Sequence, residues 1–424
     1  KVILASDMAP HLTLIAPAFN EGYNIQENVH SLLTLNYNKY EVIGVNDVSK
    51  DNSLEMLINS YDLEKIIPIY NERIKAAEVK AIYKSKNPAY NKLIVVDKFN
   101  GGKADALNVG INISSNPFII CIDVDCILHK DALLILAKPF LEKSAGHVIA
   151  TGGVVRIANS CVIKGGSLMQ INVPRKLLPR VQVIEYLRAF LLGRMAWSNL
   201  DGLLLISGAF GMFDKEIAIK AGGYNPNTVG EDMELVVRMR RYMLESNQPY
   251  SVSYIPNPLC WTEAPETFSI LRKQRSRWTR GTMETLWIHR KMFFNPKYKV
   301  LGLLSVPYWF VFEYLAPLIE FAGLLITVLF AVFGFLNWGF FLLLVLFVYS
   351  FAVMFSILTL LTEEYTYHQY PKVKDFGSLL VGILIEPFYF HPFTLYAALL
   401  GNLEKITGKK GWGDMQRTGF QKKT

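Results

Sequence analysis

Residues 321–362 form a run of 42 consecutive positions without a charged side chain, and this run constrains the fold more than any other feature. A transmembrane helix needs about 20 apolar residues, so a single helix cannot use the whole run. The apolar character extends back to about Leu301, and an Asn-Trp-Gly turn occupies positions 337–339. We therefore predict two transmembrane helices, at about 303–334 and 340–362.

Lysines flank the two predicted helices. Lys297 and Lys299 precede the first, and Lys372 and Lys374 follow the second, whereas the turn between them has no Lys or Arg. The positive-inside bias then places both outer flanks in the cytoplasm. We expect a multi-pass protein of the plasma membrane, the bacterial inner membrane, whose N-terminal part lies in the cytoplasm.

A third apolar segment covers residues 376–401 and contains two prolines, Pro387 and Pro392, beside Glu386 and His391. These residues interrupt a continuous lipid-exposed helix. We predict an interfacial or re-entrant broken helix here, which keeps residues 402–424 in the cytoplasm.

The composition fits a protein that is partly embedded in a membrane. Hydrophobic residues make up 51% of the chain and the formal net charge is +8, which excludes a disordered or fibrous protein. Residues 301–400 hold two Lys and no Arg against six acids, so the rest of the chain carries +12. This charge favours an anionic bilayer face and an acidic substrate. Nucleic acid alone would also explain the charge, but no nucleic-acid module is recognisable, and we predict no nucleic-acid partner.

The N-terminal end and the cysteines give two further expectations. No signal peptide is recognisable, and because the chain begins at Lys1 we expect that upstream residues precede it. The four cysteines form no CxxC pair, which predicts a reducing cytoplasmic setting without structural disulfides or zinc; they are Cys121, Cys126, Cys161 and Cys260.

The first 300 residues alternate between short β-branched runs and helix-like stretches. We predict strands at 12–18, 41–46, 92–96 and 117–122, and helices that include 25–35 and 103–113. This alternation predicts βαβ units and a mostly parallel sheet. In such sheets ligands bind beyond the carboxyl ends of the strands, so the residues that follow these strands are the first candidates for a site.

Asp123 and Asp125 follow one of the predicted strands. Two carboxylates with one residue between them can both turn toward a hard divalent cation, and Mg²⁺ or Mn²⁺ would complete its ligand shell with diphosphate oxygens. The same tripeptide is also common in surface turns.

Two further motifs lie at predicted helix N-termini, where anions or acidic side chains are stabilised. Gly101-Gly102-Lys103 opens the helix 103–113, and Gly230-Glu231-Asp232 opens an amphipathic stretch at 233–244. A tight turn with a solvated Lys, and a simple helix-dipole preference, are the structural alternatives.

Gln274, Arg277 and Trp278 are spaced i, i+3 and i+4, which places them on one face of a helix at about 267–290. A guanidinium binds diphosphate bidentately, and an indole stacks on a pyranose ring. An amphipathic structural helix remains the alternative. Residues 175–197 mix arginines with apolar side chains, which predicts an interfacial helix.

Glu313 and Glu320 are seven residues apart on the first predicted membrane helix, so they share one face. Carboxylates inside a membrane helix are costly and indicate a polar pathway, which would suit a hydroxyl-rich polymer. A position near the interface, or pairing with another helix, is the alternative.

Together these motifs resemble the processive, membrane-embedded branch of glycosyltransferase family 2, which includes poly-N-acetylglucosamine, hyaluronan, chitooligosaccharide and cellulose synthases. The resemblance covers nearly the whole chain and includes the blocks at 16–21, 45–47, 207–212 and 262–266. It implies a GT-A-type nucleotide-sugar-binding α/β domain with a mostly parallel sheet, followed by transmembrane and interfacial helices. The implied domains are a cytoplasmic transferase domain at 1–295, a membrane region at 296–401 and a cytoplasmic tail at 402–424.

The resemblance also implies residue roles. Asp232 matches the family's general base, and Asp125 with Asp123 matches its metal site for Mg²⁺ or Mn²⁺. The nucleotide-binding positions are Pro17, Asn20, Glu21, Asp47, Lys103, Asp123 and Arg277. The acceptor-binding positions are Gln274, Trp278 and Glu231. Val48 departs from the Gly that many relatives have after the Asn-Asp pair, which puts the shape of the turn beside Asp47 in doubt.

Residues 412–417 resemble the gating loop of hyaluronan synthases, with Trp412 and Arg417 in the matching positions. Asp414 stands where Thr is usual, and its charge would repel a diphosphate unless it points away.

We therefore expect an inverting, processive β-glycosyltransferase that polymerises sugar from a UDP-sugar donor, UDP-N-acetylglucosamine, and moves the polysaccharide across the bilayer. A small accessory membrane subunit is a further expected partner. Two alternatives stay open: a non-processive transferase that adds one sugar to a lipid carrier or glycolipid, and a catalytically idle scaffold.

Overall fold

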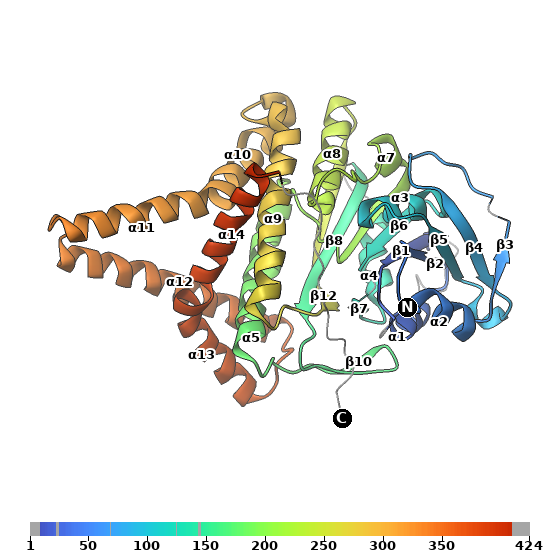
Figure 1. Cartoon of the computed structure of the whole chain (residues 1–424), viewed down its shortest axis with the longest axis horizontal. Helices are drawn as coiled ribbons and strands as arrows, with labels where there is room; N and C mark the ends of the chain where they lie inside the picture. Colours follow the sequence, from blue (N-terminus) through green and yellow to red (C-terminus); the bar gives the residue numbers. More distant parts are fainter. Residues whose placement is uncertain (1–8, 23–24, 68, 124, 143–145, 409–424) are drawn as a thin grey trace.

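The computed structural model describes residues 9–408, apart from 23–24, 68, 124 and 143–145. An α/β body forms one side of the molecule, and a hairpin of two long helices projects from the other (Figure 1). Most of the buried apolar side chains belong to a core built around the sheet of the α/β body.

Ten of the strands in the described ranges form one sheet, in the order β3-β4-β5-β2-β1-β6-β11-β8-β12-β7. They are β1 (Leu12–Ala18), β2 (Tyr40–Asn46), β3 (Leu63–Ile66), β4 (Val79–Ser85), β5 (Leu93–Lys98), β6 (Phe118–Ile122), β7 (Ile127–Leu128), β8 (His147–Ile157), β11 (Phe210–Asp214) and β12 (Tyr250–Thr262). The strands β5, β2, β1 and β6 are mutually parallel, and β12 is parallel to β8. The pairings of β3, β4, β7 and β11 are antiparallel. A separate hairpin joins β9 (Val162–Lys164) and β10 (Ser167–Gln170).

The parallel centre of the sheet confirms the prediction of a mostly parallel α/β fold. Strand β1 is buried along nearly its whole length, as expected for a strand covered on both faces. The predicted strand at 12–18 coincides with β1, and the strands predicted at 41–46, 92–96 and 117–122 begin or end within two residues of β2, β5 and β6.

Helices pack on the sheet and against one another. They are α1 (Ile25–Leu33), α2 (Ser53–Ser60), α3 (Lys103–Ile113), α4 (Ala132–Leu141), α5 (Leu177–Tyr186), α6 (Arg194–Asn199), α7 (Lys215–Lys220), α8 (Glu231–Glu245) and α9 (Phe268–Ile288). A π-helical segment, η3 (Leu187–Gly193), joins α5 to α6, so the stretch predicted at 175–197 is helical through most of its length. Short 3₁₀ turns cover Pro88–Tyr90, Arg290–Met292 and Pro296–Tyr298.

Two helices are long and apolar enough to cross a membrane. The first covers Leu301–Val332 and includes η6 (Leu301–Ser305), α10 (Val306–Tyr308), η7 (Trp309–Leu315) and α11 (Ala316–Val332), whereas the second is α12 (Trp338–Thr366). Asn337 caps α12, because its side-chain oxygen accepts a hydrogen bond from the amide of Phe340 at 3.1 Å. The two predicted membrane helices are thus confirmed as helices, with ends shifted by two to four residues.

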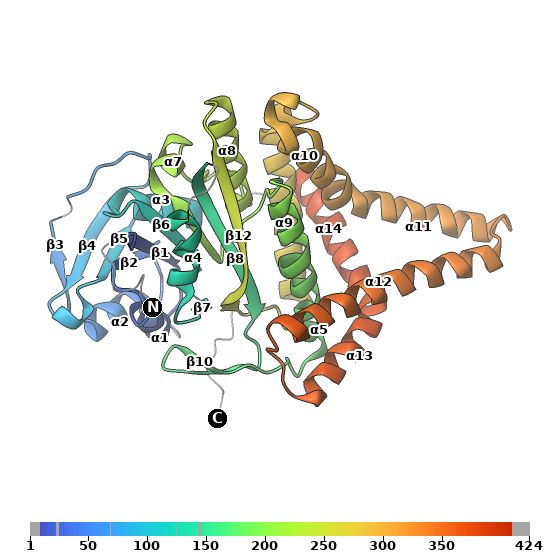
Figure 2. The same ribbon diagram turned by 180° about the vertical axis from the view of Figure 1, so that it is seen from behind.

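The third apolar segment folds into two helices, α13 (Val373–Tyr389) and α14 (His391–Ile406), which are bent by 47° at their junction. Pro387 lies inside α13, and Pro392 lies in the first turn of α14, so the predicted break is present. Both views show this pair at the base of the projecting hairpin, with α14 beside α9 (Figures 1 and 2).

One partly buried and one buried ion pair join the membrane helices to the α/β body. The guanidinium of Arg188, in η3, donates to both carboxylate oxygens of Glu386 on α13, at 2.9 and 3.1 Å. Arg156 on β8 pairs with Glu363 near the end of α12. These contacts fix the base of the hairpin against the domain that carries the candidate site.

Candidate active site

The site begins where β6 ends. Asp123 follows β6 directly, and Lys103, the first residue of α3, places its ammonium 2.5 Å from the Oδ1 atom of Asp123. The same ammonium lies 3.5 Å from the Oε1 atom of Glu231, at the start of α8. Three motifs that are far apart in the sequence therefore meet around one lysine.

Burial and neighbouring charges shift the pKa values of Lys103 and Glu231. Burial works against the charged form of Lys103, but Asp123 and Glu231 outweigh it and raise the lysine pKa. Burial raises the pKa of Glu231 to about 7, against the opposing effect of Lys103. Lys103 thus remains a fixed cation, whereas Glu231 changes charge near neutral pH.

Asp232 is the second residue of α8, and both of its carboxylate oxygens accept backbone hydrogen bonds. Its Oδ2 accepts from the amide of Gly208, and its Oδ1 accepts from the amide of Met233, each at 2.9 Å. A Cβ atom on Gly208 would lie 3.2 Å from Oδ2 of Asp232 and 3.3 Å from the Lys103 ammonium. Glycine therefore leaves the room in which these two side chains face each other.

Helix α9 carries the Gln274, Arg277 and Trp278 triad on the side that lines the cavity. The neighbouring Arg275 forms a bidentate ion pair with Glu185 of α5, at 2.8 and 2.6 Å. Its guanidinium also lies 4.2 Å from the centre of the Trp278 ring, which is 42% exposed. The indole is thus held from one side by a paired cation.

A cavity of about 670 Å³ joins these groups and continues to the first membrane helix. It is lined by ten of the residues predicted for the site: Lys103, Asp123, Asp125, Glu231, Asp232, Gln274, Arg277, Trp278, Glu313 and Glu320. At the membrane end, His391 of α14 lies 2.8 Å from the Oε1 atom of Glu320. Three of the predicted nucleotide-binding residues, Lys103, Asp123 and Arg277, therefore share one continuous space with the predicted channel acids.

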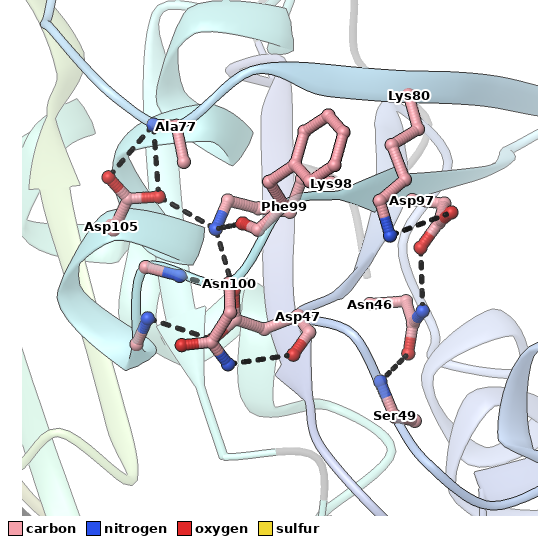
Figure 3. Close-up of polar contacts among 12 residues, drawn as sticks. Asn46, Asp47, Ser49, Ala77, Lys80, Asp97, Lys98, Phe99, Asn100 and Asp105 are labelled. Carbon is pink, nitrogen blue, oxygen red and sulfur yellow. Dashed lines mark hydrogen bonds and ion pairs between the residues drawn. The ribbon is translucent and has the colours of Figure 1, made fainter.

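Asp47 lies outside that cavity, in a buried network beneath the start of α3 (Figure 3). Its carboxylate accepts hydrogen bonds from the amides of Gly101 and Gly102, at 3.0 and 2.8 Å, and from the ammonium of Lys98 at 2.6 Å. Lys98 is fully buried and also pairs with Asp105 at 2.7 Å. These contacts hold the Gly-Gly-Lys turn in place. Asp47 therefore helps to position Lys103 at the site.

The other predicted nucleotide-binding residues at the amino-terminal end also lie outside the cavity. The side chain of Asn20 accepts from the amide of Lys50 at 2.7 Å, and the amide of Glu21 donates to Ser53 at 3.1 Å. Pro17 is half-buried near the end of β1. The predicted gating residues, Trp412 and Arg417, lie outside the described residues.

The two aspartates predicted to bind a metal both lie at the cavity. Among the described residues, no three His, Cys, Asp or Glu side chains converge as a metal-binding group. Asp123 and Asp125 both line the cavity, and Asp125 is buried. Two carboxylates beside a space for phosphate oxygens suit Mg²⁺ or Mn²⁺, which take few protein ligands when a substrate supplies the rest.

Several supporting residues could not be found from sequence. They are Glu185, Glu284, Lys405 and His391, and each contacts a site residue or a segment that carries one. Their partners lie 55 to 121 positions away in the sequence. Only His391 had a local signal, because it lies between two prolines in an apolar segment.

Comparisons with known proteins find a matching family model and related sequences. A family model described as "Glycosyltransferase like family 2" matches residues 9–281. A relative from Staphylococcus epidermidis named poly-beta-1,6-N-acetyl-D-glucosamine synthase is 28% identical over 275 residues, which cover 65% of this chain and 55% of the relative. A relative of the same name from Staphylococcus aureus is 31% identical over 278 residues, with the same coverage of both chains. The chain thus spans about half the length of the curated relatives that it matches.

A solved structure of similar fold is the mannosyltransferase PcManGT from Pyrobaculum calidifontis in complex with GDP-Man and Mn²⁺. It superposes with a TM-score of 0.53 at 14% identity and covers 96% of this chain and 93% of that chain. At this identity the likeness concerns the fold, and it confirms the predicted GT-A-type architecture.

Proposed function

Because this chain belongs to glycosyltransferase family 2, we propose that it is a processive, inverting β-glycosyltransferase that polymerises sugar from UDP-N-acetylglucosamine and passes the polymer into the membrane. The observation that carries this proposal is the continuous cavity from Lys103 and Asp232 to Glu320 on the first membrane helix. The two staphylococcal relatives named as poly-N-acetylglucosamine synthases support the choice of sugar.

Two cations of this chain would bind the donor diphosphate. Lys103 is a fixed positive charge at the N-terminus of α3, and Arg277 lines the same cavity from α9. A lysine provides a point charge and an arginine a bidentate fork, so together they would stabilise the negative charge that develops on the departing UDP.

Asp125 and Asp123 would hold a divalent cation, Mg²⁺ or Mn²⁺. When bound, such a metal supplies additional positive charge beside the leaving diphosphate. The mannosyltransferase of similar fold, which was solved in complex with GDP-Man and Mn²⁺, is consistent with this choice.

Asp232 would be the general base. The amides of Gly208 and Met233 orient its carboxylate, which faces the cavity. The acceptor hydroxyl loses its proton to Asp232 while its oxygen forms a bond to the anomeric carbon, and the bond from that carbon to the UDP oxygen breaks. This single displacement inverts the anomeric configuration and needs no covalent glycosyl-enzyme.

The acceptor end of the polymer would lie between the base and the membrane. Trp278 offers an indole face for a sugar ring, and Gln274 and Glu231 offer polar contacts. Glu313 and Glu320 would line the path by which the product leaves. In this arrangement the catalytic domain lies on the cytoplasmic side of a bacterial inner membrane, and the two long helices cross the bilayer.

Product length tests the proposal. Purified protein in lipid nanodiscs would be supplied with Mg²⁺ or Mn²⁺ and a panel of radiolabelled UDP-sugars, with Asp232→Asn as the control. A long polymer from UDP-N-acetylglucosamine that a specific glycosidase digests, and that the variant does not make, is the expected result. Single-sugar products that extract into organic solvent would replace the proposal with a glycolipid transferase, and an equal product from Asp232→Asn would refute the assigned base.

A further inference from the structure

The segment that precedes the base is held by a residue that no sequence motif marks. Glu284 lies on α9, the helix of Gln274 and Trp278, and follows Arg277 by about two turns. Its Oε2 atom accepts a hydrogen bond from the hydroxyl of Thr228 at 2.8 Å and another from the amide of Val229 at 2.9 Å. One carboxylate oxygen thus holds two consecutive residues of the segment that leads into α8.

The same segment is pressed against α9. The amide of Gly230 donates to the hydroxyl of Thr228 at 3.1 Å, which closes a tight turn. A Cβ atom on Gly230 would lie 2.7 Å from the Cα atom of Gly281, and a Cβ atom on Gly281 would lie 2.7 Å from the Cα atom of Gly230. Both positions require glycine, and the backbone of the segment therefore lies directly on the helix that carries the triad.

Gly230 is the N-cap of α8, and Asp232 follows two residues later. A shift of the turn at 228–230 would therefore move the first turn of α8 and, with it, the carboxylate of Asp232. Because proton transfer and attack depend on the distance between base and acceptor oxygen, a shift of about 1 Å at this point costs a large part of the rate.

The second oxygen of Glu284 is held by the C-terminal helix. The ammonium of Lys405 on α14 donates to Oε1 of Glu284 at 2.6 Å. Burial works to raise the pKa of Glu284, but the hydrogen bonds from Lys405, Val229 and Thr228 outweigh it and lower that pKa, so the carboxylate stays ionised. The neighbouring Glu404 also contacts α9, through the hydroxyl of Ser276. The C-terminal end of α14 thus contacts α9 at Glu284, the residue that holds the segment before Asp232.

We propose that Glu284 is a positioning residue for Asp232, and that its ion pair with Lys405 makes this positioning depend on the docking of α14. The inference rests on the proposed function, in which Asp232 is the base. Helix α14 would then have two roles. It packs beside the membrane helices, and through Lys405 it also helps to hold Asp232 in position.

Three variants distinguish the contributions of the contacts that the two carboxylate oxygens of Glu284 make. Glu284→Ala removes both contacts, whereas Glu284→Gln keeps an oxygen that can accept from Val229 and Thr228 but loses the charge pair. Lys405→Met removes the same pair from the other side. Glu142→Gln is the control, because that acid is exposed, pairs with Lys138 on the surface and does not line the cavity.

Steady-state kinetics with the donor give the first readout. We expect Glu284→Ala to lower kcat about tenfold or more while the donor KM changes less than about twofold. Glu284→Gln and Lys405→Met should each lower kcat by a smaller and similar factor, and the double variant should equal either single variant, because all three remove one contact. Lys405→Arg keeps a cation at this position, so its kcat should stay close to that of the wild type. A rise in KM with kcat intact, or additive effects of Glu284→Gln and Lys405→Met, would overturn the proposal.

Hydrogen exchange without substrate gives a second readout that does not depend on activity. Peptides that cover residues 228–235 should exchange faster in Glu284→Ala and in Lys405→Met than in the wild type, while peptides of the sheet stay unchanged. Unchanged exchange at 228–235 in the variants would refute the role of Glu284 in holding this segment, even if the protein polymerises sugar. If the wild type turned over no donor, but residues 228–235 still exchanged faster in the variants, the proposed function would be refuted. The contact of Glu284 with the segment at 228–230 would then still stand.

Discussion

Arg156 on β8 and Glu363 near the end of α12 form an ion pair in which both side chains are buried, although 207 positions separate them in the sequence. The ring of Tyr367 lies 5.9 Å from the same guanidinium. This pair connects a strand beside the candidate site to a membrane helix, so the hairpin and the transferase domain are one packed unit at this point.

Breaking that pair from one side should be strongly destabilising. We expect Arg156→Met to lower the stability by about 3–5 kcal/mol, because it leaves the Glu363 carboxylate buried without its cation. The double variant Arg156→Met with Glu363→Leu should recover much of the loss, since two apolar side chains replace the whole pair. Thermal unfolding of the detergent-solubilised protein measures both effects.

The surface pair of Lys138 and Glu142 is the control for this experiment, because both side chains are more than half exposed. Lys138→Met should change the stability by less than about 1 kcal/mol. If Arg156→Met were equally harmless, the buried pair would contribute little to the attachment of the hairpin.

Glu231 predicts a pH effect on stability. Burial raises its pKa to about 7 in the folded protein, from a reference value of 4.5. Between these values the folded state binds a proton that the unfolded state has released, so this group makes stability fall as the pH rises from about 4.5 to 7. The full difference amounts to on the order of 3 kcal/mol.

Glu231→Gln should remove this contribution. The melting temperature of the variant, relative to the wild type, should therefore be higher at pH 7.5 than at pH 5. The comparison between the two proteins cancels the other groups that titrate in the same range. An equal difference at both pH values would show that Glu231 titrates normally in the folded protein.

Trp278 should affect the acceptor more than the donor. Trp278→Ala removes the exposed indole face but leaves the ion pair between Arg275 and Glu185, so α9 should stay in place. We expect shorter products and a rise of about tenfold in the acceptor KM, with UDP affinity unchanged. Trp287→Ala is the matched control, because Trp287 lies on the same helix, is 68% exposed and does not line the cavity.

The sequence predicts those parts of the fold that depend on short-range patterns of apolar and turn-forming residues. The strand at 12–18 is a continuous apolar run because it is buried on both faces, and the helix at 103–113 follows a glycine pair, so both were found within a residue or two. The paired long strands β8 and β12, the bidentate contact of Arg188 with Glu386, and the contact of Glu284 with Lys405 were not found. Each depends on partners that only the assembled chain brings together. Glu386 stands out as an acid in an apolar segment, but nothing in the local sequence identifies Arg188 as its partner.

Asp47 shows the same limit for the site. The sequence marked it as a residue near the nucleotide, but its buried partner Lys98 carries no motif, and the structure brings the two together with Asp105. Lys98→Met should leave two buried carboxylates without their cation, which costs about 3–5 kcal/mol of stability. Because Asp47 also holds the amides of Gly101 and Gly102, the variant should release the turn that presents Lys103, and UDP affinity should fall as well.

Lys80→Met provides the comparison, because Lys80 lies 3.7 Å from Asp97 in a more exposed pair and should contribute less than about 1 kcal/mol. Thermal unfolding and UDP titration by calorimetry measure the two effects separately. A loss of stability without a loss of UDP affinity would mean that the network supports only the fold. A loss of both would mean that the buried lysine sets the geometry of the Gly-Gly-Lys turn, which we propose binds phosphate, since Lys98 is fully buried and cannot reach the nucleotide itself.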